Sequence, residues 1–143
     1  MKQAAVLPVK VEGTAMVPTL NDGDLIFTTR AVEKLERGDI VLFYYPPEPS
    51  KSYIKRIIGL PNDTVEIVAG RVLLINGKQL EEPYLDPKNN LAERKFTPVK
   101  VPENNFYVMG DNRDNSFDSR SWGPLARTFI YGKFVKRYYA AKS

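Results

Sequence analysis

The sequence predicts a mainly β fold, built from antiparallel sheets with few short helices and one extended insertion. Short runs rich in Val, Ile, Phe and Tyr recur along the chain, and Gly, Pro, Asn and Asp separate them. The dipeptide Asn76-Gly77 follows one such run, and both residues tolerate the positive φ of a tight hairpin. Only residues 31–38, AVEKLERG, favour one or two helical turns, which would end at Gly38.

The expected strands follow from this punctuation, in chain order. We predict strands within residues 24–30, 39–45, 52–58, 64–69, 71–75, 105–110 and the Tyr- and Phe-rich tail 128–139. A second, weaker reversal is expected at Ala69-Gly70. Residues 81–100 are polar and contain prolines, so we interpret them as an extended insertion.

Composition restricts the possible chemistry. We interpret the whole chain, 1–143, as one domain, and no run of 18 apolar residues predicts a membrane-spanning helix within it. The absence of Cys and His excludes disulfides, thiolate nucleophiles, cysteine-ligated zinc and a Ser-His-Asp triad. Proton transfer near neutral pH therefore requires a Lys, Asp, Glu or Tyr with a perturbed pKa. The net charge of +4 comes from scattered basic residues, which favours a solvated surface over a nucleic-acid site.

Lys55 lies within the expected strand SYIKRII. Alternate residues of a strand share a face, so Lys55 lies with Tyr53 and Ile57 while Arg56 faces the other way. Burial between a ring and a branched aliphatic side chain would lower the pKa of the lysine, and a neutral amine accepts a serine proton. A Ser-Lys dyad is then possible without histidine. The alternative is a lysine that extends from a strand edge into solvent.

The polar run 110–125, GDNRDNSFDSRSWGPL, follows another expected strand. It fails as a calcium loop starting at Asp111, because the required Gly and Glu are missing, and it lacks the spacing of a phosphate-binding loop. Asp118 and Arg120 are placed to form a charge-assisted pair that holds the loop. Ser116 would then be free to orient a neighbouring group. A plain network of turn hydrogen bonds is the alternative.

The run 11–20, VEGTAMVPTL, is typical of a turn that presents one side chain. Gly13 frees the backbone at its start, and Pro18 stiffens its exit. Between them, at the presented position, is Ala15, whose methyl has no functional group.

Together, GTAMVPTL, YIKRIIGLP and GDNRDNSFDSRSWG, in this order, resemble the sequence boxes of the bacterial type I signal peptidases. The intervening RGDIVLFYYP fits the same family, and the resemblance extends over nearly the whole chain. It implies antiparallel sheets of the signal-peptidase type and no metal or cofactor. It also implies one or more N-terminal membrane helices that this sequence lacks, with residues 1–8 as a residual segment.

The resemblance implies a role for each matching residue. The family pattern G-x-S-M-x-P-T-L places a nucleophilic serine where this chain has Ala15, and Lys55 matches the general base. Ser116 matches the hydroxyl that orients the lysine, and Asp118 with Arg120 matches the ion pair that supports the site. The backbone N–H of Ala15 would remain as one oxyanion-hole donor.

The resemblance also suggests roles for residues next to these positions. Gly13 stands where some family members carry a second hydroxyl donor to the oxyanion. Candidates for substrate binding or for facing the membrane are the apolar and aromatic residues near the boxes: Met16, Val17, Pro18, Tyr53 and Trp122. Leu20 is expected to pack in the core, and core packing is the alternative for Val17 and Trp122.

The implied activity is that of a Ser-Lys endopeptidase that removes signal peptides from exported preproteins at the extracytoplasmic face of the bacterial cytoplasmic membrane. Its partners would be signal peptides and the lipid surface, without nucleic acid. Because Ala15 occupies the nucleophile position, we expect this chain to be inactive. We favour an engineered substitution, since the other site residues are present.

Two alternatives remain from the sequence. One is a naturally non-catalytic relative that binds exported peptides or a membrane partner. The other is a self-cleaving Ser-Lys protease of the repressor type, although the chain shows no helix-turn-helix pattern.

Overall fold

The computed structural model describes residues 6–69, 71–93 and 96–142, which form two antiparallel sheets. The strands of the larger sheet are β1 (Val6–Lys10), β2 (Leu25–Thr29), β3 (Ile40–Tyr44), β4 (Ser52–Gly59), β9 (Asn105–Met109), β10 (Leu125–Ala126) and β11 (Ile130–Tyr139). Those of the smaller sheet are β5 (Thr64–Val68), β6 (Val72–Ile75), β7 (Lys78–Gln79) and β8 (Val99–Lys100). The described helical segments are short: η1 (Pro87–Asn89), α1 (Ser119–Trp122) and η2 (Arg127–Phe129). The predicted fold class is therefore confirmed.

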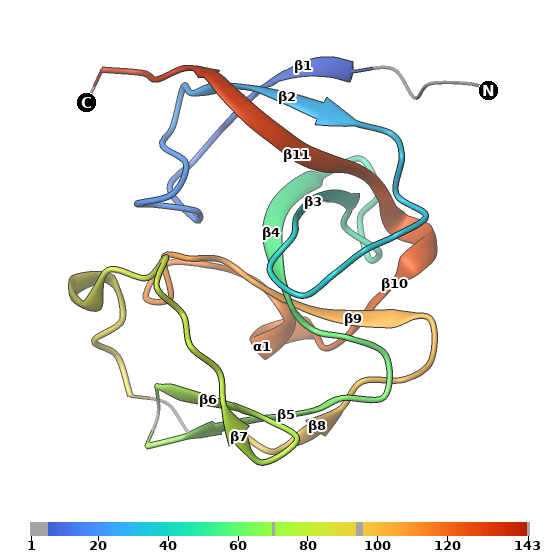
Figure 1. Cartoon of the computed structure of the whole chain (residues 1–143), viewed down its shortest axis with the longest axis vertical. Helices are drawn as coiled ribbons and strands as arrows, with labels where there is room; N and C mark the ends of the chain where they lie inside the picture. The colour runs from blue at the N-terminus through green and yellow to red at the C-terminus, as the bar shows by residue number, and fades with distance from the viewer. Residues whose placement is uncertain (1–5, 70, 94–95, 143) are drawn as a thin grey trace.

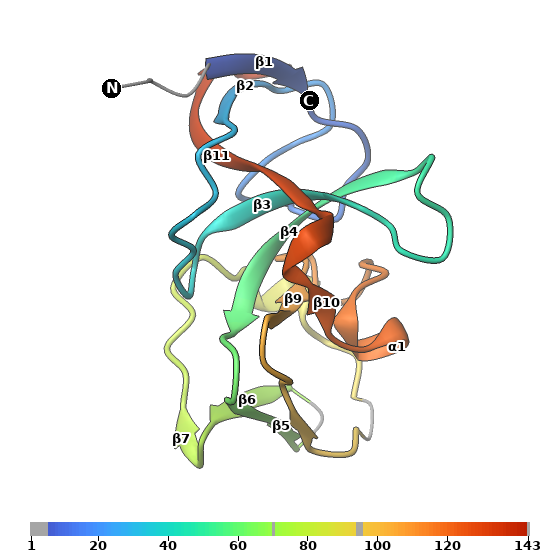
Figure 2. The ribbon, with the colours of Figure 1, turned by 90° about the vertical axis from the view of Figure 1, so that its right-hand side faces the viewer.

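The strand order brings distant parts of the chain together. The larger sheet has the order β1-β2-β11-β3-β4-β9-β10, so the last strand of the chain lies between β2 and β3. The smaller sheet has the order β7-β6-β5-β8. Figures 1 and 2 show β1 and the smaller sheet at opposite ends of the molecule, with β3, β4 and β9 between them.

The β-rich runs form strands as predicted, and each of the seven expected runs contains one. The hairpin at Asn76-Gly77 is also confirmed, because both residues have positive φ, 53° and 85°, and Ile75 pairs with Lys78 across the turn. Ala69, at the other expected reversal, has a φ of 51°, and Gly70 lies outside the described residues.

The prediction of helical turns at 31–38 is wrong. These residues form bends and a turn, and tertiary hydrogen bonds hold the end of the segment against β4 instead. The N–H of Gly38 donates to the carbonyl of Ile57 at 2.8 Å, and Nε of Arg37 donates to the carbonyl of Ile58 at 3.1 Å.

Two parts of the chain were expected to be irregular. Residues 1–5 of the expected residual segment 1–8 lie outside the described residues, and Val6 to Pro8 belong to β1. The expected insertion 81–100 contains η1 and β8, and its residues 94–95 lie outside the described residues. No helix in the described part of the chain is long and apolar enough to cross a membrane.

Three apolar clusters hold these elements together. The first is formed by side chains from strands of the larger sheet: Val41, Phe43, Ile57, Phe106, Val108, Leu125 and Ile130. The second joins the two sheets: Ile58, Tyr107 and Met109 of the larger sheet with Val65, Leu73, Ile75 and Val101. The third anchors the segment that follows β1: Val11, Met16, Leu20, Ile26 and Ile40. Burial of side chains of this size supplies the main driving force for such packing.

Candidate active site

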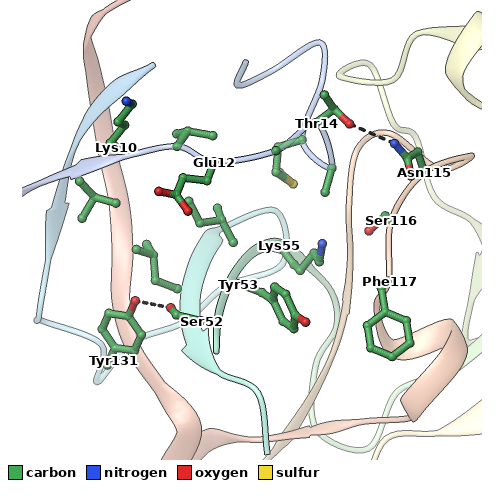
Figure 3. Close-up of a pocket in the computed structure, with 17 residues that line it drawn as sticks. Lys10, Glu12, Thr14, Ser52, Tyr53, Lys55, Asn115, Ser116, Phe117 and Tyr131 are labelled. Carbon is green, nitrogen blue, oxygen red and sulfur yellow. Dashed lines mark hydrogen bonds between the residues drawn. The ribbon is translucent and has the colours of Figure 1, made fainter. Parts of the chain in front are cut away.

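A cleft of about 460 Å³ lies where three runs of the chain meet single residues of two further strands. Its walls come from residues 9–16, from Ser52 to Lys55 on β4, from residues 115–117 and from single residues of β3 and β11. Figure 3 shows these side chains, with the amine of Lys55 directed toward the segment that carries Ser116. Ala15 lines the same cleft, so the structure brings the predicted nucleophile position, base and orienting hydroxyl into one pocket.

Lys55 is buried in the floor of this cleft. It lies in the middle of β4, is 4% exposed, and its Nζ lies 5.5 Å from the centre of the Tyr53 ring. Loss of hydration lowers the pKa of Lys55 from 10.5 to about 8, while the nearby Asp118 charge raises it and that of Arg120 lowers it. The solvent-exposed alternative for this lysine is therefore wrong. A lysine of this kind is partly uncharged at mildly alkaline pH and is then able to accept a proton.

Two buried side chains anchor the turn of residues 12–19, here called the Ala15 turn, in the third apolar cluster. Met16 and Leu20 are each 2% exposed, and the N–H of Leu20 donates to the carbonyl of Met16 at 2.9 Å. The carbonyl of Ala15 accepts from the N–H of Asn112 at 2.9 Å. The N–H of Ala15 donates to no protein acceptor within the described residues, so it is available to a ligand in the cleft.

Two further hydrogen bonds involve the residues just before Ala15. The N–H of Gly13 already donates to the carboxylate of Asp22 at 2.8 Å. The side-chain amide of Asn115 donates to the hydroxyl of Thr14 at 3.0 Å, on the rim of the cleft (Figure 3).

The run of residues 110–118, here called the polar loop, packs directly against the Ala15 turn. Its first residue, Gly110, has no room for a side chain: an added Cβ would lie 2.2 Å from Oγ of Ser116 and 2.6 Å from the carbonyl oxygen of Ala15. The N–H of Gly110 donates both to Oγ of Ser116, at 3.1 Å, and to the carboxylate of Asp118, at 3.0 Å. Gly110 is therefore the point at which the Ala15 turn and Ser116 meet.

Asp118 and Arg120 form the predicted ion pair. Nε and Nη2 of Arg120 each donate to the Asp118 carboxylate at 3.0 Å, and both side chains are buried. Burial alone raises the pKa of Asp118, but the hydrogen bonds and charge of Arg120, with the Gly110 N–H, hold this pKa below its usual value. The same carboxylate caps α1 by accepting from the N–H of Arg120 at 3.1 Å.

A second buried ion pair lies on the other face of β4. Arg56 donates from Nε and Nη2 to the Asp111 carboxylate at 2.9 and 2.7 Å, and the Thr19 hydroxyl donates to the same carboxylate at 2.5 Å. The pair thus connects β4, the polar loop and the Ala15 turn at one point. Paired, bidentate geometry is the arrangement in which buried charges are tolerated.

The chain matches one protein family over most of its length. The signature described as "Signal peptidase, peptidase S26" matches residues 1–139. The chain is 48% identical over 124 residues to a signal peptidase I of Bacillus licheniformis and 45% identical over 142 residues to signal peptidase I T of Bacillus subtilis. The chain belongs to the bacterial type I signal peptidases.

The relatives are longer than this signal-peptidase chain. The matched regions cover 80% and 90% of this chain but 66% and 72% of those two relatives. A solved signal peptidase I from Enterococcus faecalis has the same fold, with a TM-score of 0.62 and 33% identity. That match covers 73% of this chain and 100% of the solved chain, so the antiparallel fold is the fold of the family.

The structure separates the residues that were expected to bind substrate or face the membrane. Met16 and Tyr53 line the cleft, whereas Val17 and Pro18 are not among its walls. The membrane-facing alternative for Met16 is wrong, because this side chain is 2% exposed and packs in the third apolar cluster. Trp122 is half-buried and packs against the first cluster, with its ring centre 5.8 Å from that of Phe43.

Several residues that shape the site of this signal peptidase were missed from the sequence. Gly110, Asp111 and Thr19 lie within the motifs, but the motifs alone indicate no contact for them, and strand alternation places Arg56 only on the face opposite Lys55. The signal for the Arg56–Asp111 pair was present, since both residues adjoin motif positions and carry opposite charges. The sequence does not show that the two residues meet, because 55 positions separate them.

Proposed function

We propose that the parent form of this chain is a Ser-Lys endopeptidase that cleaves signal peptides from exported preproteins, and that Ala15 makes the present form inactive. The observation that carries this proposal is the cleft itself. It combines a buried lysine with a pKa of about 8, a backbone N–H without a protein acceptor at residue 15, and a neighbouring hydroxyl at Ser116. These are the base, the oxyanion donor and the orienting group that such a reaction requires.

In the active form, uncharged Lys55 takes the proton of a serine hydroxyl at position 15 as that oxygen attacks the scissile carbonyl. The Ala15 N–H, which is a backbone group and independent of the side chain, stabilises the developing oxyanion. The C–N bond then breaks, Lys55 returns the proton to the leaving amine, and an acyl-enzyme ester remains. Lys55 next deprotonates a water molecule, which hydrolyses the ester and regenerates the hydroxyl.

The cleft also suits an extended peptide. It lies between the segment that follows β1 and the beginning of β4, so a signal peptide would bind as an extended strand between them. Small side chains before the scissile bond would enter the pocket near Met16 and Tyr53.

The decisive experiment is the substitution Ala15→Ser. We expect it to restore cleavage of a preprotein in detergent or lipid, raising the rate on the order of a millionfold, which is the cost of removing the nucleophile in a serine protease. The product should end at the signal-peptide junction by mass spectrometry. If the revertant is folded and does not cleave, the dyad assignment fails.

A second substitution tests whether Lys55 is the base. Lys55→Met in the Ala15→Ser background should abolish the restored activity, since no other described lysine lines the cleft except Lys10. Lys10→Met is the matched control and should retain activity. Cleavage by the Lys55→Met variant would remove Lys55 from the proposed role.

We also propose that this domain acts at the membrane surface on the extracytoplasmic side. An aromatic group beside the cleft supports this. Phe117 is 48% exposed, and its ring centre lies 5.6 Å from that of Tyr45 and 6.5 Å from that of Trp122. Aromatic side chains of this kind favour the lipid interface. Binding to lipid vesicles should therefore weaken in Phe117→Ser, as measured by co-sedimentation.

A second function is favoured by one observation: residue 15 carries a methyl group instead of a hydroxyl. A natural non-catalytic peptidase relative would bind signal peptides in the same cleft without cleaving them. Peptide binding by the present chain, together with a folded but inactive Ala15→Ser variant, would support this function.

A further inference from the structure

Residues 82–92, here called the brace, contact the polar loop through side-chain and backbone bonds. The main contact is a buried ion pair between Glu82 and Arg113, whose side chains are 8% and 2% exposed. Nη1 of Arg113 donates to Oε1 of Glu82 at 3.2 Å, and Nη2 donates to Oε2. These bonds outweigh the effect of burial and raise the pKa of Arg113.

The same guanidinium also holds the backbone of the site. Nε of Arg113 donates to the carbonyl of Gly110 at 2.9 Å. Gly110 is the crowded residue whose Cα faces both Oγ of Ser116 and the carbonyl of Ala15. A displacement of Arg113 therefore acts on the contact between the polar loop and the Ala15 turn.

Two further contacts connect the brace to this region. The hydroxyl of Tyr84 donates to Oε2 of Glu82 at 2.8 Å, and the guanidinium carbon of Arg56 lies 3.8 Å from the centre of the Tyr84 ring. Arg56 is the neighbour of Lys55 in sequence and the partner of Asp111. The brace thus reaches β4 as well as the polar loop.

The far end of the brace is held by its backbone. The N–H of Asp114 donates to the carbonyl of Asn89 at 2.9 Å, and the Asp114 carboxylate accepts from the N–H groups of Leu91 and Ala92. The brace therefore contacts the polar loop at both ends.

We propose that the brace positions the catalytic groups, and that Glu82 is the positioning residue that fixes Gly110, and through it Ser116 and Lys55, by way of Arg113. None of the brace residues that carry this argument lines the cleft, so the effect on chemistry is indirect. The kinetic part of the proposal rests on the proposed function, whereas the structural part does not.

The test compares Glu82→Gln with Glu81→Gln, which removes the same charge one residue away from an exposed side chain. Both are made in the Ala15→Ser background and assayed with a signal-peptide substrate. For Glu82→Gln we expect kcat to fall about 10- to 100-fold with KM within about twofold, because a small misplacement of catalytic groups is costly. The pH at which kcat reaches half its maximum should rise, since a loosened site hydrates the Lys55 amine.

A purely structural role would reduce the active fraction equally at all pH values and leave that midpoint unchanged. The proposal is overturned if folded Glu82→Gln has the same midpoint as Glu81→Gln, whether or not its kcat is lower. If Glu82→Gln does not fold, Glu82→Asp replaces it. This variant keeps the charge but is too short for both Arg113 contacts, and an unchanged kcat and midpoint there also overturns the proposal.

A measurement without catalysis separates this proposal from the proposed function. In the present Ala15 chain, Glu82→Gln should speed amide hydrogen exchange in peptides covering 110–118 by about tenfold, with β3 and β4 unchanged. An inactive Ala15→Ser variant would refute the dyad, and the brace would then be judged by this exchange. Equal exchange in the two Gln variants would refute the brace even if the revertant is active.

Discussion

At the scale of single residues, the chemistry depends on one amine that the fold keeps out of water. Lys55 has a pKa of about 8 in the folded protein, mainly because burial penalises its charged form. The nearby Asp118 and Arg120 charges oppose one another, so burial decides the direction. The same burial that activates the base must reduce the stability of the protein while the lysine is charged.

This cost gives a prediction for the present chain. Between pH 8 and pH 10.5 the unfolded chain binds more protons than the folded one, so the Lys55 contribution to stability improves as pH rises through this range. Below that range the full penalty remains, about 3 kcal/mol. Lys55→Met should therefore be more stable than its parent at pH 7 by up to about 3 kcal/mol, and the difference should shrink as pH rises above about 8 and be nearly lost by about pH 10.5. Denaturant unfolding at several pH values measures this.

The control for this prediction is Lys136→Met, at an exposed position on β11. It should change stability by less than about 0.5 kcal/mol. A Lys55→Met variant that is less stable than the parent at pH 7 would show that the amine is not a buried charge.

The same pKa sets the pH dependence of the active revertant. In Ala15→Ser, kcat/KM should rise with pH as Lys55 loses its proton, with a midpoint of about 8. A rate that is constant between about pH 6 and about pH 9 would contradict Lys55 as the base.

At the scale of elements, the short helix α1 exists because a carboxylate holds its first turn. A helix of four residues has no stability of its own, and nucleation is unfavourable. Asp118 supplies the cap, the partner of Arg120 and an acceptor for the Gly110 N–H. Ser119 connects α1 to β9, because its hydroxyl accepts a hydrogen bond from the N–H of Val108 at 2.9 Å.

Asp118→Asn tests this role. It keeps the size of the side chain but leaves the buried Arg120 without a countercharge, so we expect a loss of about 3 kcal/mol in the free energy of unfolding. The matched control is Asp86→Asn, which caps η1 without a buried ion pair and should cost below about 1 kcal/mol. Equal losses in thermal or denaturant unfolding would show that the Asp118 charge is not important.

At the scale of the whole molecule, the two sheets depend on one another through the second apolar cluster. The two sheets pack tightly at Gly59, at the end of β4, where an added Cβ would lie 2.7 Å from Cγ2 of Val65 and 3.1 Å from Cγ2 of Val101. Because the two sheets share this cluster, we expect them to unfold together, which agrees with the single domain proposed from the sequence.

Gly59→Ala should therefore destabilise the protein by about 1–3 kcal/mol through overpacking, and it should still show one unfolding transition. Gly132→Ala on β11 is the control, because its Cβ would meet ordinary contacts of 3.6 Å or more. Circular dichroism and Trp122 fluorescence should give coincident transitions for both variants. Separate transitions would mean that the smaller sheet folds independently.

Much of the fold followed from local sequence. The strands, the Asn76-Gly77 hairpin and the Asp118–Arg120 pair were predictable because their signals lie within a few residues. The helical turns at 31–38 were not, because hydrogen bonds to β4 decided that segment. Among the site residues, Met16 was placed in the correct box, but its burial could not be read from the box alone.

By itself, the sequence determined the β-rich fold class, the family and the positions that carry its motifs, because these depend on local patterns of side chains. Only the tertiary structure decided that Lys55 is dehydrated and that Gly110 leaves no room for a side chain. It also showed that Glu82, within the expected insertion 81–100, binds Arg113 of the polar loop in a buried ion pair. Each of these depends on atoms from segments far apart in the chain, and hydration and steric space arise only when those segments are brought together.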